Sequence, residues 1–125
     1  MPPAERPLPH WLTVSADPAP AVVDGRVCRT RAAFLAEVAR VLCFPDYFGH
    51  NWDALTDCLR DATHITGLAL VVAHAEELLA AEPAEQLATL LAVLADAADA
   101  GLTLTLCTDP DHEALLRQRV TAALP

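Results

Sequence analysis

The sequence predicts an α/β fold in which parallel strands alternate with helices. Short apolar runs of β-leaning residues alternate with longer segments in which apolar residues recur at helical spacing. Gly or Pro stands at most of the boundaries between these segments. Strands joined through a helix run parallel when the crossover is right-handed. We therefore expect a three-stranded parallel sheet packed with about four helices, followed by an extra helix at the C-terminal end.

The first 20 residues differ from the rest because they hold six of the ten prolines. Residues 11–15 (WLTVS) are suited to a short strand, but the prolines on both sides limit it. We therefore expect residues 1–20 to be a Pro-rich extension, ordered in part at best, and residues 21–125 to form the folded domain.

Local signals place the elements of this domain. Thr30 and Asn51 are suitable N-caps, Pro83 suits the first position of a helix, and Gly101 suits a helix end. Residues 68–74 are nearly all apolar, which favours a strand covered on at least one face and, for so apolar a run, on both. The expected strands are 21–25, 68–74 and 102–107; the expected helices are 31–42, 51 to about 60, 75–81, 83–100 and 110–124, with a loop over 44–50.

Composition excludes several classes of function. The chain has 8 basic residues, all of them Arg, against 17 acidic ones, for a net charge of −9. This balance argues against nucleic acid or an anionic membrane as partner, and it fits a cationic partner or simply good solubility. No apolar run has the length of a membrane span or a signal peptide. We expect a cytoplasmic protein.

The sequence contains none of the familiar catalytic motifs. It has no glycine-rich phosphate-binding motif, and Ser15, its single serine, lies in the Pro-rich extension. The four cysteines form no C-x-x-C pair and are expected to be buried free thiols. One alternative remains, a small metal-dependent enzyme in which His50, Asp53 and Asp57 hold a divalent ion. That signal is weak because D-x-x-x-D is common in helices, and we expect no cofactor.

The stretch FPDYFGHNWDALTDCLRD carries acids every fourth residue, at Asp53, Asp57 and Asp61. On a helix these three share one face, where like charges repel. Asp53 is favourable in the first turn, but Asp57 lies past the middle of a helix of about ten residues, and Asp61 stands at its expected end.

A second helix repeats the pattern, because Asp96 and Asp99 lie just before Gly101, where the helix dipole favours cations. Acids placed against local preference are expected where function overrides stability. Solvated surface acids are an equally open interpretation.

The same stretch resembles the binding segment of barstar-like proteins, small intracellular inhibitors of secreted bacterial ribonucleases. The shared pattern, P-[DE]-Y-[YF]-G-x-N-x-D-A-L-x-D-C-L, stands here as PDYFGHNWDALTDCL, from Pro45 to Leu59. VVDG before it and LADAADAG with LTLTL after it also match. The resemblance covers about residues 21–108, leaving out the N-terminal extension and the last helix. It implies a two-layer α/β domain with a three-stranded parallel sheet.

The resemblance also implies a function: an immunity protein that blocks the active site of a cationic bacterial ribonuclease, one-to-one and without chemistry, and is a monomer when free. Asp57 would then sit where the RNA phosphate belongs. The residues that the resemblance assigns to the partner interface, including two that depart from the family pattern, are Tyr47, Gly49, Asn51, Asp53, Thr56, Asp57, Arg60 and Asp96.

Three residues depart from the family pattern. Thr56 stands where the best-known members carry Trp, Arg60 stands where they carry a small polar residue, and His50 replaces an acid. Thr56 would give a cationic target less apolar contact, and Arg60 would repel it. The alternative partner is therefore a different nuclease, or a toxin that is not a nuclease.

Overall fold

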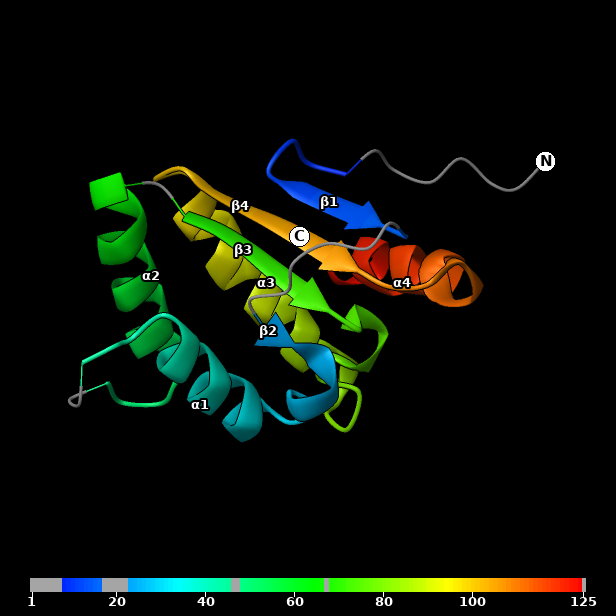
Figure 1. Ribbon diagram of the computed structural model, residues 1–125, viewed down its shortest axis with the longest axis horizontal. Helices are drawn as coiled ribbons and strands as arrows, with labels where there is room; N and C mark the ends of the chain where they lie inside the picture. The colour runs from blue at the N-terminus through cyan, green and yellow to red at the C-terminus, as the bar shows by residue number, and fades with distance from the viewer. Residues whose placement is uncertain (1–7, 17–22, 46–47, 67, 125) are drawn as a thin grey trace.

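The computed structural model describes residues 8–16, 23–45, 48–66 and 68–124, with the backbone alone for 64–66. Figure 1 shows helices packed against one twisted sheet. Its elements are, in order, β1 (Leu12–Ser15), β2 (Val23–Asp24), the 3₁₀ turn η1 (Gly25–Val27), α1 (Arg31–Val41), α2 (Trp52–Thr66), β3 (Leu68–Ala73), the 3₁₀ turn η2 (Ala75–Glu77), α3 (Ala84–Ala98), β4 (Leu102–Cys107) and α4 (Pro110–Ala123).

The sheet has four strands in the order β1-β4-β3-β2, and every neighbouring pair is parallel. The α/β class is confirmed, but the expected count of three strands is wrong. The additional strand, β1, comes from the stretch assigned to the extension, and it pairs with β4 in the register Leu12↔Leu104. An edge strand of four residues needs partners on one side only, so the prolines beyond its ends do not interrupt it.

One face of this sheet carries the core. In β4, Leu102, Leu104 and Leu106 are buried whereas Thr103 is exposed, and in β3 Ala69 is exposed between better covered neighbours. The expected cover of β3 on one face is confirmed, but its second face is not fully covered, since burial alternates with the pleat. Figure 1 shows α3 passing behind β3 and β4, with α2 and α4 on either side of it. The result is a two-layer architecture.

Helices α1 and α4 begin where their caps predict, whereas α3 begins at Ala84, one residue later than expected, with Pro83 as its N-cap. Thr30 Oγ1 accepts a hydrogen bond from Ala33 N at 3.1 Å, and Asp109 Oδ1 accepts one from His112 N at 3.0 Å. The short helix expected over 75–81 is only the 3₁₀ turn η2. None of the described helices has the length and apolar character needed to cross a membrane.

The largest correction concerns α2, which runs to Thr66 and not to about Arg60. No Gly or Pro interrupts the chain between residue 52 and Gly67, so nothing local ends the helix earlier. Asp61 therefore lies inside a helix of 15 residues. Asp61 is not at the helix end, and Asp57 lies before the middle of α2 and not past it, so the dipole argument no longer holds for either residue.

The four cysteines are free, as expected, but they are not all buried. Cys28 and Cys107 are buried, and burial raises the pKa of the Cys28 thiol to about 12. Cys58 is partly covered and Cys43 is exposed. The raised thiol pKa makes Cys28 an unreactive core residue.

Candidate functional site

The loop before α2 is anchored by aromatic packing. Phe48 is buried, and its ring lies 5.1 Å from that of Phe44 and 4.8 Å from that of His50, centroid to centroid. The backbone N–H of Phe48 also donates to the carbonyl of Pro45 at 2.9 Å. Tyr47, which the resemblance assigns to the interface, lies outside the described residues. Its role stays a prediction.

Gly49 and Asn51 shape the entry into α2. Asn51 Oδ1 accepts a hydrogen bond from Ala54 N at 2.8 Å, which confirms Asn51 as the N-cap. Its Nδ2 donates back to Gly49 O at 3.3 Å. A Cβ on Gly49 would lie 3.1 Å from that same Nδ2. Both residues therefore have a structural reason to be present, independent of any partner.

The inner face of α2 fixes the helix to the core. Leu55 and Leu59 are fully buried. Trp52 packs on Phe34 with ring centroids 6.2 Å apart, and its Nε1 donates to Gln86 Oε1 on α3 at 3.3 Å. Because this inner face is held by α1 and α3, the outer face cannot rotate or shift easily.

The outer face of α2 presents the acids. Asp53, Asp57 and Asp61 are all exposed, as their spacing predicts. Within the described parts of the chain, none of the three makes an ion pair or a side-chain hydrogen bond. The hydroxyl of Thr56, on the same helix, donates to the carbonyl of Trp52 at 3.0 Å. Thr56 is therefore half-buried and already hydrogen-bonded, whereas the carboxylates are unpaired.

Arg60 pairs with Asp96 across the contact between α2 and α3. Its Nη1 lies 3.6 Å from Asp96 Oδ2, and the side chains are 59% and 40% exposed. This distance is an ion pair but too long for a hydrogen bond, and Asp96 Oδ2 is buried without one among the described residues. Asp96 lies in the last turn of α3, which holds no basic residue of its own. Arg60 therefore supplies the cation that this helix end lacks.

The ion pair also brings the two acidic segments together, because it joins α2 to the C-terminal end of α3. The sequence identifies Arg60 only as a departure from the family pattern, and its tertiary pairing with Asp96 could not be read from spacing. Thr63 was missed as well. It is buried beside Gly101, and its methyl group would lie 3.7 Å from a Cβ at that glycine. Thr63 reaches this position beside Gly101 only because α2 continues past Arg60 to Thr66.

The proposed metal site is not formed. His50, Asp53 and Asp57 are all described, and no three His, Cys, Asp or Glu side chains in the described ranges lie close enough to share an ion. The His50 ring instead packs on Phe48, and its Nδ1 lies 3.0 Å from the carbonyl oxygen of Phe48. His50 has a backbone φ of 51°, a left-handed conformation that positions it in the loop.

Comparison with known proteins identifies the family. The family model described as Barstar (barnase inhibitor) matches residues 19–112, which is more than half of the chain. The match includes β2 to β4 and α1 to α3, whereas β1 and most of α4 lie outside it. Curated proteins give no match to the chain. With the acidic α2, its capped entry loop and the parallel sheet in place, the chain belongs to the Barstar (barnase inhibitor) family.

Proposed function

We propose that this protein is an intracellular immunity protein that blocks the active site of a cationic bacterial ribonuclease. The observation that carries the proposal is that α2 exposes carboxylates without partners on a helix that is fixed to the core. Its inner face is locked into the core, while Asp53 and Asp57 stand exposed and without partners in the described structure. The family's description as a barnase inhibitor supports the same assignment.

The mechanism we propose is occupation of the phosphate-binding site. A ribonuclease must hold a phosphate with cationic groups, and a carboxylate can accept bidentate hydrogen bonds from Arg in the same place. Asp57 lies in the middle of the acid row and would enter this site, with Asp53 beside it. Gly49 and Asn51 would shape the approach of the loop, and Tyr47 would contact the nuclease. The protein would act one-to-one in the bacterial cytoplasm, without cofactor or catalysis.

Arg60 and Asp96 would form the border of this interface. Because Arg60 is 59% exposed, a partner would meet a cation next to the acid row. Thr56 offers a small, partly covered surface where a large aromatic ring would give more contact area. These two residues favour a second candidate, a toxin of another class whose surface carries an acid opposite Arg60.

The test is inhibition of small basic microbial ribonucleases in a fluorogenic RNA-cleavage assay. Stoichiometric inhibition is expected from the wild type. The Asp57→Asn variant keeps the shape of the side chain and should weaken inhibition by about tenfold or more, because a charged hydrogen bond is lost. Asp111→Asn on α4 changes net charge equally and should inhibit like the wild type.

Two results would contradict the proposal. If Asp57→Asn and Asp111→Asn inhibited equally well, α2 would not be the binding element. If the wild type inhibited no ribonuclease but bound a toxin of another class, the second candidate would replace the first.

A further inference from the structure

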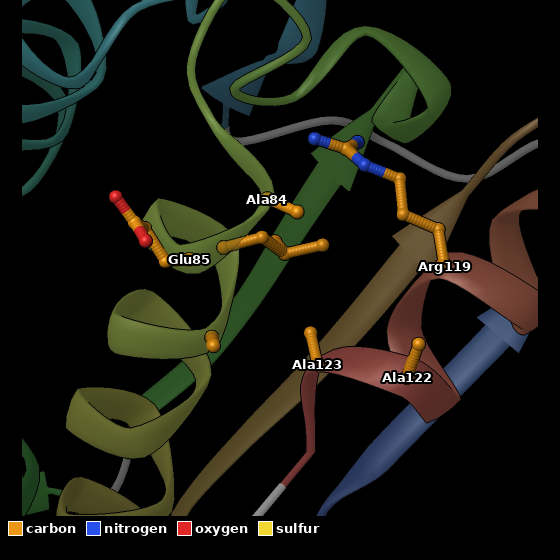
Figure 2. A pocket seen from close by; sticks show the side chains of 7 residues that line it. Ala84, Glu85, Arg119, Ala122 and Ala123 are labelled. Carbon is orange, nitrogen blue, oxygen red and sulfur yellow. The ribbon is translucent and has the colours of Figure 1, made fainter.

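A second site lies between the first two turns of α3 and the last turns of α4. The hollow there measures about 270 Å³. Figure 2 shows the side chains around it, with Ala84 on one side and Arg119, Ala122 and Ala123 on the other. It is distinct from the acidic face, since Asp96 marks the opposite end of α3. Its lining is Ala84, Glu85, Leu87, Ala88, Arg119, Ala122 and Ala123.

The notable member of this lining is Arg119, whose Nη1 is buried and has no hydrogen-bond acceptor in the described residues. Burial lowers the pKa of its guanidinium, which nevertheless remains charged at neutral pH. Arg117, two residues earlier, contrasts with it. That side chain donates to Glu113 Oε2 at 3.0 Å and to the carbonyl of Val14 at 3.1 Å. A half-buried cation without an acceptor is unfavourable and calls for an explanation.

Among the described residues, the carboxylates near Arg119 do not act as its hydrogen-bond acceptors. A second hollow, of about 290 Å³, also borders Arg119 and contains Glu76 and Glu77. Glu76 accepts a hydrogen bond from Thr108 Oγ1 at 2.6 Å, and Glu77 Oε2 lies 2.9 Å from Arg29 Nε. Both acids are therefore engaged elsewhere. Glu85 lines the first hollow, but Figure 2 shows its side chain directed away from Arg119.

We propose that the hollow between α3 and α4 binds a small monocarboxylate with a short aliphatic tail. Its carboxylate would accept hydrogen bonds from the Arg119 guanidinium, once that side chain turns its buried Nη1 towards the hollow, and its tail would lie on Leu87 and the alanines. The lining holds one cation, Arg119, and one anion, Glu85, which is directed away from it, so a ligand with a single negative charge fits better than one with several. The protein's net charge of −9 disfavours polyanions such as phosphate esters. The volume lies below the usual range of drug-sized pockets, about 300–1,000 Å³, so a small ligand fits.

This site depends on α4, most of which lies outside the family match. It is therefore not expected of the family as a whole. It is also independent of ribonuclease binding, so either proposal can fail without the other.

The experiment is a titration followed by backbone amide NMR on the full chain, with isocaproate as the probe. We expect saturable shifts confined to residues 84–88 and 119–123, with a Kd of about 1 mM or below. Isocaproamide has the same tail without the charge and should produce no saturable shift. Arg119→Gln should abolish the isocaproate shifts, whereas Arg40→Gln on α1, with the same change in net charge, should retain them.

Several outcomes would overturn the proposal. One is that the shifts do not saturate by about 10 mM isocaproate. Another is that isocaproamide binds the wild type as well as isocaproate does, and a third is that Arg119→Gln binds isocaproate as well as the wild type does. Inorganic phosphate that bound as tightly as isocaproate would also overturn it, because the site would then select charge alone. The amide comparison uses the wild type only, so the test holds even if Arg119→Gln alters the fold.

Discussion

The ion pair with Arg60 gives Asp96, the acid at the end of α3, a structural explanation. From sequence, Asp96 looked like an acid tolerated against the helix dipole for the sake of function. The ion pair with Arg60, at 3.6 Å, gives it a local partner instead. Asp61 likewise lies within α2 and not at its end. What remains as an argument for function is the row of carboxylates on one face of α2, which have no ion-pair partner among the described residues and repel one another.

At this residue scale, we predict that Arg60→Ala strengthens binding to a basic ribonuclease. The change removes a cation from the border of the acidic face and leaves Asp96 free for a cation of the partner. The measurement is the inhibition constant of the variant relative to the wild type. Arg40→Ala on α1 is the matched control, since it removes the same charge and should leave the constant nearly unchanged.

The stability of Arg60→Ala should change by at most about 1 kcal/mol, because both partners of the ion pair are more than one third exposed. A weaker inhibitor with unchanged stability would contradict the prediction. It would mean that the partner carries an acid opposite position 60, as the second candidate requires.

The sequence predicted residues whose role is local and missed those whose role is tertiary. Thr30 and Asn51 were identified as caps because a cap depends only on the three residues that follow it. The exposed acids of α2 followed from helical spacing. The Arg60–Asp96 pair joins two helices, and Arg119 is defined by what surrounds it, so neither could be found without the packed fold.

The same division holds for whole elements. The end of α2 was placed too early because the apolar pattern weakens after Leu59, although no residue there breaks a helix. Strand β1 was not counted in the sheet because the flanking prolines argued against it. Its pairing with the backbone of β4 could not be seen in the sequence. Tertiary pairing therefore outweighed local propensity in β1, whereas α2 continues past Leu59 because no residue there breaks a helix.

At the element scale, Gly25 is predicted to be irreplaceable at the junction of β2 and η1. A Cβ there would lie 2.2 Å from the carbonyl oxygen of His74 and 2.9 Å from that of Ala73, which are backbone atoms at the end of β3. Gly25→Ala should destabilise the fold by about 3 kcal/mol or more, as a lower urea midpoint. At Gly49 the nearest atom is the movable Nδ2 of Asn51, so Gly49→Ala should cost less than about 1 kcal/mol. Equal shifts in the two midpoints would contradict this account.

A second prediction at this scale concerns the pH dependence of α4. His112 Nδ1 lies 2.7 Å from Asp109 Oδ1, and the hydrogen bond between them raises the pKa of His112 and lowers that of Asp109. The contribution of His112 is complete below its ordinary pKa of 6.5 and is lost as pH rises through the higher folded value. That of Asp109 is complete above 3.8 and is lost as pH falls through the lower folded value.

The pair should therefore stabilise the start of α4 most between the two ordinary pKa values. Hydrogen exchange of the α4 amides would measure this, with His112→Gln as the control. Relative to that variant, the wild type should be better protected at about pH 5, and the difference should shrink towards about pH 8.5. A constant difference across this range would show that the pair does not titrate as described.

At the scale of the whole molecule, the two proposed sites use opposite ends of α3. The acidic face gathers at its C-terminal end through α2, and the Arg119 hollow lies at its N-terminal end against α4. The two-layer arrangement makes this possible, because α3 lies between α2 and α4 on one face of the sheet (Figure 1). A protein with this layout could bind a cationic protein and a small acid at the same time.

The net charge of −9 leads to the last prediction, that salt slows association with a cationic ribonuclease. Raising ionic strength from about 20 to about 200 mM shortens the Debye length and should lower the association rate constant by about tenfold, with a smaller effect on dissociation. Stopped-flow fluorescence would measure both rates. Asp57→Asn should mainly speed dissociation because it removes a contact, whereas Asp111→Asn, with the same net charge, should leave dissociation unchanged. An association rate that did not depend on salt would mean that the acidic face does not steer the partner, whatever contacts it makes once bound.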